Sequence, residues 1–190
     1  AVVDLSRNAV YTVAEMKRLL IYMALIGQNR FYMYMEDTYE LPDYPYSRNM
    51  RGRYSLVELK QIDDFADSLG IEVIPCIQTL AHLKTTLKWQ YAQNMKDTDE
   101  IMLVGDESTY QFIEAMLVTL KNTFRTRKIH IGMDEAMNLG TGKYLEKNGP
   151  RNQFDVMIEH LNRVNEIAEK HGLQPMMWDD MFYRSHDVTH

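Results

Sequence analysis

Strand-like segments alternate with helix-like segments along the whole chain, and this alternation constrains the fold more than any other feature. Apolar, β-branched or aromatic runs predict strands at residues 1–5, 30–35, 71–78 and 175–178, and a further strand from Lys128 up to the acids at 134 and 135. Helical spacing of apolar residues predicts helices at 13–26, 56–69, 107–124 and 154–171. Strands that alternate with helices indicate a parallel sheet with right-handed crossovers.

Two α/β folds compete for this pattern. An open, doubly wound sheet is the alternative, but the turn after the first strand lacks the glycine fingerprint of a nucleotide site. An eight-stranded barrel needs about 200 to 250 residues or more. We therefore expect a (β/α)8 TIM barrel that is incomplete here, with about the first five strands and four helices. Residues 1–190 would be the N-terminal part of one domain, and the last three strands would lie beyond His190.

The amino-acid composition disfavours several classes of binding partner. The net charge of −6 and the pI near 5.5 argue against a nucleic acid or an anionic membrane, because both favour a basic face. No apolar run approaches the roughly 18 residues of a membrane span. Cys76 is the one cysteine, so an internal disulfide is excluded. With no signal segment in the chain, we expect a cytoplasmic location.

Polar or aromatic side chains follow every predicted strand. In a barrel these ends meet at one mouth, where active sites of this fold lie. A cation, an imidazole, several carboxylates and an indole around one pocket suit a carbohydrate, because charged groups bind hydroxyls and an aromatic face covers the sugar ring. The residues in question are Arg7, Glu36, Asp37, His82, Asp134, Glu135, Trp178, Asp179 and Asp180.

Each of these residues also has a purely structural interpretation. Arg7 could form a salt bridge with Asp37 or Asp180. His82 could be a structural histidine bonded to backbone, and Trp178 could belong to the core. Asp180 could cap a following helix. The joint pattern favours a site over these separate explanations.

Residues His130-Ile131-Gly132-Met133-Asp134-Glu135 resemble the His-x-Gly-x-Asp-Glu signature of the family 20 glycoside hydrolases, the β-N-acetylhexosaminidases. Other segments resemble parts of this family in the right order. They are Asp4-Leu5-Ser6-Arg7, Met35-Glu36-Asp37, the segment from Ile74-Pro75 to His82, and Met177-Trp178-Asp179-Asp180. In the third of these, Cys76 and Gln78 replace two acids and Leu80-Ala81 replaces Pro-Gly, which suggests a divergent, bacterial branch.

The resemblance implies a function and a set of roles. It implies an exo-acting β-N-acetylhexosaminidase that removes terminal N-acetylglucosamine or N-acetylgalactosamine with retention, through an oxazolinium formed by the substrate's own acetamide. Glu135 would be the general acid and base, and Asp134 would hold the acetamido group. The substrate-binding residues would be Arg7, Glu36, Asp37, His82, Trp178 and Asp180. A carbohydrate is the expected partner, and no cofactor or metal is expected.

Two other functions remain open at this stage. One is a metal-dependent barrel hydrolase whose ligands would be His82, Asp134, Glu135 and Asp180. The other is a non-catalytic sugar-binding domain. We also expect the isolated 190-residue chain to be inactive, because part of a barrel leaves sheet edges and the pocket unfinished. A homodimer is left open.

Overall fold

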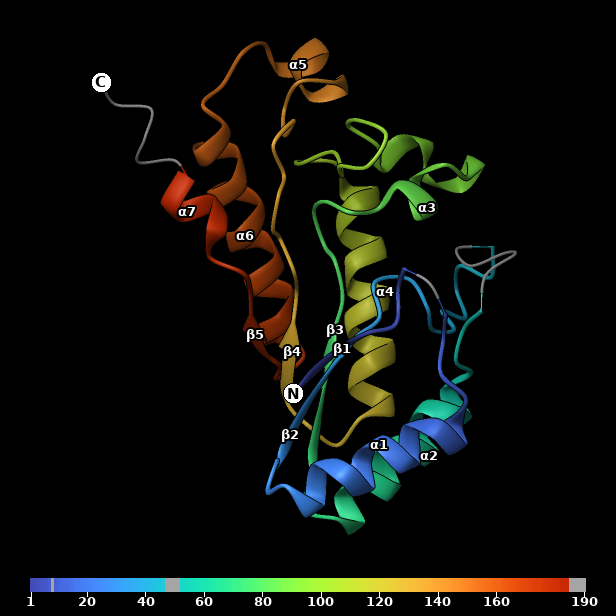
Figure 1. Ribbon diagram of the computed structural model, residues 1–190. Helices are drawn as coiled ribbons and strands as arrows, with labels where there is room; N and C mark the ends of the chain where they lie inside the picture. The colour runs from blue at the N-terminus through green and yellow to red at the C-terminus, as the bar shows by residue number, and fades with distance from the viewer. Residues whose placement is uncertain (8, 47–51, 185–190) are drawn as a thin grey trace.

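The computed structural model describes residues 1–7, 9–46 and 52–184 and shows one parallel sheet. Its strands lie in chain order, from β1 through β2, β3 and β4 to β5 (Figure 1). The bounds are β1 (Val2–Asp4), β2 (Arg30–Tyr34), β3 (Glu72–Cys76), β4 (Lys128–His130) and β5 (Gln174–Met176). Each neighbouring pair is parallel, so the carboxyl ends of all the strands face one edge of the sheet.

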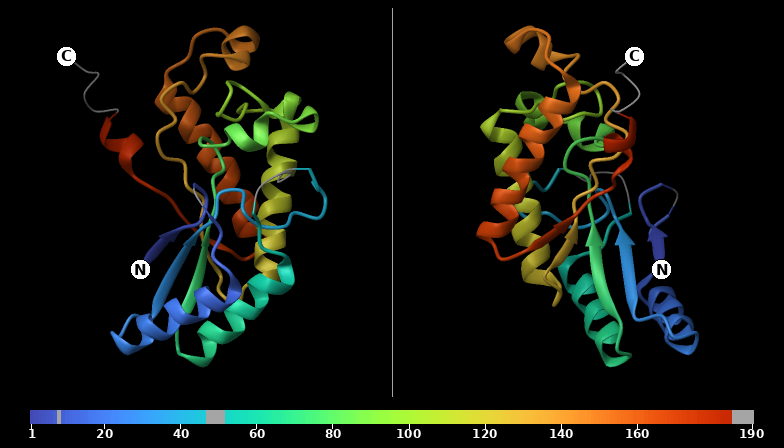
Figure 2. Two further views of the ribbon diagram at one scale, coloured as in Figure 1. Left: turned by 45° about the vertical axis from the view of Figure 1, so that its right-hand side comes forward. Right: turned by 90° about the vertical axis from the view of Figure 1, so that its left-hand side faces the viewer.

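Four long helices connect the strands: α1 (Val13–Leu25), α2 (Leu56–Ser68), α4 (Glu107–Thr123) and α6 (Gln153–Lys170). They pack in the same order as the strands, with α1 on α2, α2 on α4 and α4 on α6. Figure 2 shows them succeeding one another around the sheet. A doubly wound sheet would instead place helices on both faces. The prediction of an incomplete (β/α)8 barrel is therefore confirmed, whereas the three strands expected beyond His190 stay a prediction.

The helices begin where the sequence signals place them. The hydroxyl of Thr12 accepts a hydrogen bond from the backbone N–H of Glu15 at the start of α1. Ser55 and Glu58 form a reciprocal capping box at the start of α2. Both helices end one residue earlier than predicted, at Leu25 and Ser68, because the chain turns into the left-handed conformation at the glycines that follow.

The core lies between the sheet and these helices. Side chains such as Leu20, Phe31, Met33 and Ile62 are completely buried there, and each such burial stabilises the fold by about 1.5 to 3 kcal/mol. Cys76 is also buried, and this burial raises the pKa of its thiol to about 12, so it remains a protonated core residue. Within the described ranges, no helix combines the length and apolar character needed to cross a membrane.

Short helices shape the rim where the strands end. They are α3 (Lys84–Leu87) and η1 (Gln90–Met95) after β3, α5 (Lys143–Asn148) after β4, and α7 (Asp180–Arg184) after β5. The segment after β3 folds back on itself, because the N–H of Leu83 donates to the carbonyl of Glu100 and the N–H of Met102 donates to the carbonyl of Leu80. This segment therefore stands over the end of β3, at the same edge as the predicted site residues (Figure 1).

Candidate active site

The backbone beyond β4 turns sharply through left-handed residues. The strand ends at His130, and φ is then +74° at Gly132, +72° at Met133 and +52° at Glu135. On a regular strand, adjacent side chains point to opposite faces, so this turn is what allows Asp134 and Glu135 to share a site. A left-handed, non-glycine residue costs roughly 1 to 3 kcal/mol and is typical of functional sites.

Left-handed conformations also mark the ends of β2 and β3. In the described chain, the non-glycine residues with positive φ are Glu36 after β2, His82 after β3, and Met133 and Glu135 after β4. All of them lie at the carboxyl edge of the sheet, and none lies in the helices or the opposite loops. Strain is therefore concentrated at one rim, which indicates a site there.

His82 brings the two acids together. Its Nε2 lies 3.3 Å from Oδ2 of Asp134 and 3.6 Å from Oε2 of Glu135. Neither contact has hydrogen-bond geometry, so Nε2 remains a buried polar atom without a hydrogen bond among the described residues. The side chain of Glu135 is 58% exposed, whereas that of Asp134 is 21% exposed. Glu135 thus faces solvent, whereas Asp134 is partly buried.

Further polar groups bind the side chain of Asp134 and the backbone of Glu135. The Nε2 of Gln78 donates a 2.7 Å hydrogen bond to Oδ1 of Asp134. The backbone N–H of Glu135 donates to Oδ2 of Asp180 at 3.2 Å. Asp180 was predicted as a substrate ligand, but here it holds the backbone that carries Glu135. A direct contact with substrate stays a prediction.

A second charged group lies at the ends of β1 and β2. NH1 of Arg7 lies 2.6 Å from Oδ2 of Asp4, and its NH2 lies 3.5 Å from Oε1 of Glu36. Glu36 is buried, and burial raises the pKa of its carboxyl, although hydrogen bonding from Tyr34 and the charge of Arg7 act against this rise. The side chain of Arg7 is more than half exposed, so it places a positive charge at the carboxyl edge of the sheet.

Asp37 and Trp178 occupy different surroundings. Asp37 is buried and accepts a 2.6 Å hydrogen bond from Oγ1 of Thr85, so it anchors the segment after β3. The indole of Trp178 is 39% exposed and lies 4.5 Å from the ring of His130, measured between centroids. Trp178 therefore offers part of an aromatic face at the rim. The sugar-binding roles of both residues stay predictions.

The sequence did not single out Tyr34 or Gln78 as site residues. Gln78 is completely buried, and its Nε2 also donates a 2.9 Å hydrogen bond to the hydroxyl of Tyr34. Tyr34 in turn donates to Oε1 of Glu36 at 2.9 Å. A usable signal was present, because a polar side chain at the end of an apolar, fully covered strand needs a buried partner.

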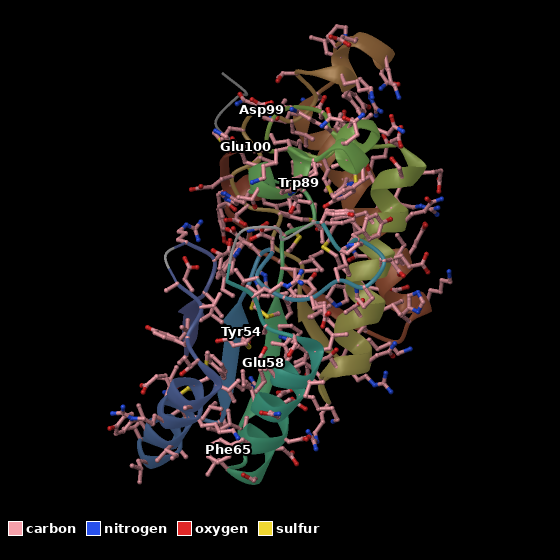
Figure 3. All side chains as sticks on the ribbon, turned by 90° about the vertical axis from the view of Figure 1, so that its right-hand side faces the viewer. Tyr54, Glu58, Phe65, Trp89, Asp99 and Glu100 are labelled. Carbon is pink, nitrogen blue, oxygen red and sulfur yellow. The ribbon has the colours of Figure 1, made fainter. Side chains whose placement is uncertain are left out.

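A cavity of about 390 Å³ adjoins the outer side of Glu135. It lies between the segments that follow β3 and β4, and its lining residues are Ala81, His82, Glu100, Glu135, Met137 and Asn138. Figure 3 shows Glu100 beside Asp99 at the end of the molecule that carries Trp89, far from Phe65 on α2. Asp134 is absent from the lining, so the cavity lies on the solvent side of the acidic pair.

His160 on α6 supports the segment that carries His82. Its ring is completely buried, with Nε2 2.8 Å from the carbonyl oxygen of Thr79 and Nδ1 3.4 Å from the hydroxyl of Tyr110. A carbonyl can only accept, so Nε2 carries the proton of a neutral imidazole. Burial lowers the pKa of His160 to about 4, against the ordinary value of 6.5.

Stability should therefore fall in mild acid because of His160. Below about pH 6.5 the unfolded chain binds a proton on this imidazole, but the folded chain does not do so until about pH 4. Between about pH 7 and pH 4 the wild type should lose about 3 kcal/mol more stability than His160→Gln, which cannot titrate there. Urea unfolding at several pH values measures this difference. Equal losses in both proteins would contradict the assignment.

Among the residues that the structure describes, no group of three or more His, Cys, Asp or Glu side chains is arranged to hold a metal ion. The metal-dependent alternative therefore rests on the sequence pattern alone.

Comparisons with known proteins agree with this fold. A family model described as "Glycosyl hydrolase family 20, catalytic domain" matches residues 1–190. Hexosaminidase D of Bos taurus and of Homo sapiens are each 25% identical to this chain, over 166 and 170 residues. Each match covers 82% of this chain, but only 48% of the Bos taurus protein and 34% of the human one.

Solved structures resemble this chain over nearly its whole length. The β-N-acetylhexosaminidase from Bacteroides fragilis has a TM-score of 0.83 at 21% identity, covering 96% of this chain and 42% of that one. The enzyme from Streptomyces coelicolor has a TM-score of 0.79 at 22% identity, covering 95% and 39%. A mutant β-hexosaminidase from Streptomyces plicatus in complex with its product GlcNAc has a TM-score of 0.80 at 21% identity, covering 95% and 38%. At these identities the likeness shows a shared fold.

Proposed function

This chain belongs to glycosyl hydrolase family 20, and we propose that it forms the first part of the catalytic barrel of a retaining, exo-acting β-N-acetylhexosaminidase. The observation that carries the proposal is the arrangement around His82, whose Nε2 lies within 3.6 Å of both Asp134 and Glu135. The relatives named hexosaminidase D and the Streptomyces plicatus complex with GlcNAc support an N-acetylhexosaminide as the substrate class.

The adjacency of the two acids supports a nucleophile that comes from the substrate. Most glycosidases place two carboxyl groups on opposite sides of the scissile bond, about 5 to 9.5 Å apart. Asp134 and Glu135 are consecutive and share one imidazole, so they approach a sugar from the same side. The oxygen of the 2-acetamido carbonyl then attacks the anomeric carbon, and the bond to the leaving oxygen breaks.

Glu135 is the proton donor in this scheme. It is the more exposed of the two acids and borders the outer cavity, so it reaches the leaving oxygen as the bond breaks. It then takes a proton from the water that opens the oxazolinium and regenerates the acetamide. Two displacements at the same carbon give net retention of configuration.

Asp134 stabilises the charge that develops. Its position inside the turn lets a carboxylate oxygen face the acetamido N–H, which becomes more acidic as the oxazolinium forms. A fixed negative charge in a partly buried site stabilises such a cation more than water does. Arg7 and Glu36 are available for the outer hydroxyls of the same sugar, and the exposed face of Trp178 for its apolar side.

Hydrolysis assays with the full-length protein test the proposal. We expect release of para-nitrophenol from the N-acetyl-β-glucosaminide or the N-acetyl-β-galactosaminide, with the β-anomer of the sugar appearing first by proton NMR. First appearance of the α-anomer would contradict retention. Absence of hydrolysis of both glycosides, with binding of the free sugar retained, would favour the sugar-binding domain instead.

The outer cavity is proposed as the place of the leaving sugar. The carboxylate of Glu100 can accept hydrogen bonds from hydroxyls, the amide of Asn138 can accept or donate them, and Met137 supplies an apolar surface. Glu100→Gln should lower kcat/KM for N,N′-diacetylchitobiose about fivefold, because an exposed, charge-assisted hydrogen bond contributes about 1 kcal/mol. The aryl glycoside should change little, because a phenol makes fewer hydrogen bonds there.

Asp99→Asn is the matched control for Glu100→Gln. Asp99 is adjacent, strongly exposed and paired with Lys96, and it does not line the cavity. The control removes the same charge from the same loop, so it should leave both substrates unaffected. Equal effects of Glu100→Gln on the disaccharide and on the aryl glycoside would contradict a leaving-sugar site in this cavity.

A further inference from the structure

Gln78 occupies the centre of a hydrogen-bond chain with a fixed direction. The backbone N–H of Met133 donates to Oε1 of Gln78 at 3.1 Å. Because an N–H can only donate, the amide oxygen must face Met133, and the NH2 group must face Asp134 and Tyr34. Both amide hydrogens are therefore used, in the bonds of 2.7 Å to Asp134 and 2.9 Å to Tyr34.

The hydrogen bonds keep the same donor-to-acceptor direction from Gln78 to Glu36, which follows β2. The hydroxyl of Tyr34 accepts from Gln78, so its own hydrogen is free to point at Oε1 of Glu36, 2.9 Å away. The chain thus runs outward from one neutral amide to two carboxylates, that of Asp134 directly and that of Glu36 through Tyr34. A neutral amide neither gains nor loses a proton in the physiological range, so it donates at every pH and passes no proton between the two acids.

The backbone at Gly132 and Met133 leaves space for the amide of Gln78. A Cβ at Gly132 would stand 2.0 Å from Oε1 of Gln78 and 2.7 Å from the carbonyl oxygen of Ile77, so glycine alone fits there. Gly132 and Met133 both have left-handed φ, which turns the N–H of Met133 toward the amide. The strained turn at Gly132 and Met133 therefore has two effects: it brings the two acids together, and it makes room for the Gln78 amide and bonds to it.

We propose that Gln78 is a positioning residue that fixes the rotation of Asp134 through a donor that does not titrate, whereas an acid in its place would share a proton with Asp134. This proposal rests on the proposed function for its catalytic consequence. Two carboxyl groups at hydrogen-bond distance in a buried site bind one proton tightly between them, whereas an amide and a carboxylate do not.

Gln78→Glu in the full-length enzyme tests the proposal. The introduced carboxyl would lie beside Asp134, so the acid limb of the pH profile of kcat should move up by about one pH unit or more. Tyr34→Phe is the milder variant, because it keeps the bond from Gln78 to Asp134 and removes the two bonds of the Tyr34 hydroxyl, the one from Gln78 and the one to Glu36. It should leave that limb in place and raise KM by about threefold to tenfold, the effect of about 1 kcal/mol.

Gln153→Glu is the matched control. Gln153 donates through Nε2 to the carbonyl oxygens of Ala136 and Met137, so it supports the same loop after β4 without touching Asp134. Its change from amide to acid can slow the enzyme through a displaced loop, but it should leave the acid limb unshifted. An equal shift in Gln153→Glu and Gln78→Glu would overturn the proposal.

A second measurement keeps this proposal separate from the proposed function. Carbon-detected NMR of the Asp134 carboxyl, assigned by its loss in Asp134→Asn, follows protonation without any turnover. In Gln78→Glu, Asp134 should take up its proton about one pH unit or more above the wild type. Superimposable titrations would overturn the role of Gln78 even if the enzyme hydrolyses N-acetylhexosaminides. A shift without any hydrolysis would support that role while the proposed function fails.

Discussion

Glu135→Gln should lower kcat about a hundredfold or more for a disaccharide substrate in the full-length enzyme. Glutamine fills the same space but cannot give a proton to the leaving oxygen, and general-acid catalysis typically contributes factors of about 10² to 10⁴. The loss should be smaller for an activated aryl glycoside in the first step, because its phenolate leaves without a proton. Steady-state assays on both substrates measure this difference.

The matched control for this variant is Glu146→Gln on α5, an exposed glutamate that follows the same strand. It should retain the activity of the wild type on both substrates. Near-normal turnover of the disaccharide by Glu135→Gln would remove Glu135 from the role of proton donor. Equal losses on the disaccharide and the aryl glycoside in the first step would do the same.

Asp134→Asn should lower kcat by about a hundredfold for N-acetylhexosaminides. Asparagine keeps the size of the side chain but removes the negative charge that faces the developing oxazolinium, and one preorganised electrostatic partner is worth about 10² to 10³ in kcat. It also sets two amides face to face, because Gln78 donates its NH2 to Oδ1 at this position. Urea unfolding of the variant separates lost stability from lost catalysis.

Asp155→Asn provides the comparison, because Asp155 is an exposed acid on α6 and is not among the site residues. It carries the same change of charge, so it should leave kcat close to that of the wild type. Asp134 would lose its assigned role if both variants slowed the enzyme to the same extent. Unchanged kinetics in Asp134→Asn would lead to the same conclusion.

The sequence predicted the fold because its signals are local. Capping residues such as Thr12 and Ser55 and apolar runs such as 71–78 each depend on neighbours within a few positions. Their alternation then implies a parallel sheet with strands in chain order. Strand ends were predicted less accurately, because the strand that begins at Lys128 ends at His130, whereas the prediction extended it up to Asp134.

The site was only partly predictable, because its internal contacts join residues that are far apart in the chain. The residues Arg7, His82, Asp134 and Glu135 follow from their places after strands. The bond between Gln78 and Asp134 spans 56 positions, so the sequence can indicate that Gln78 needs a buried partner but not that this partner is Asp134. The hydroxyl of Tyr34 links Gln78 to Glu36, and this link also joins residues that follow different strands.

Several predictions made from the sequence are not tested by the contacts within the protein. The contacts of Arg7 and Glu36 with the outer hydroxyls of an N-acetylhexosamine stay predictions. A cytoplasmic location and a homodimer stay predictions, as do the individual roles of Asp37, Trp178 and Asp180 toward substrate.

The most direct test compares two substrates that differ only at the second carbon of the sugar. The full-length protein should cleave para-nitrophenyl N-acetyl-β-glucosaminide with a kcat/KM at least about a hundredfold above that for para-nitrophenyl β-glucoside, because a neighbouring acetamide acts as an intramolecular nucleophile. Comparable rates on the two glycosides would contradict the account, because a site that cleaves both equally has no need of the acetamide that Asp134 is placed to hold.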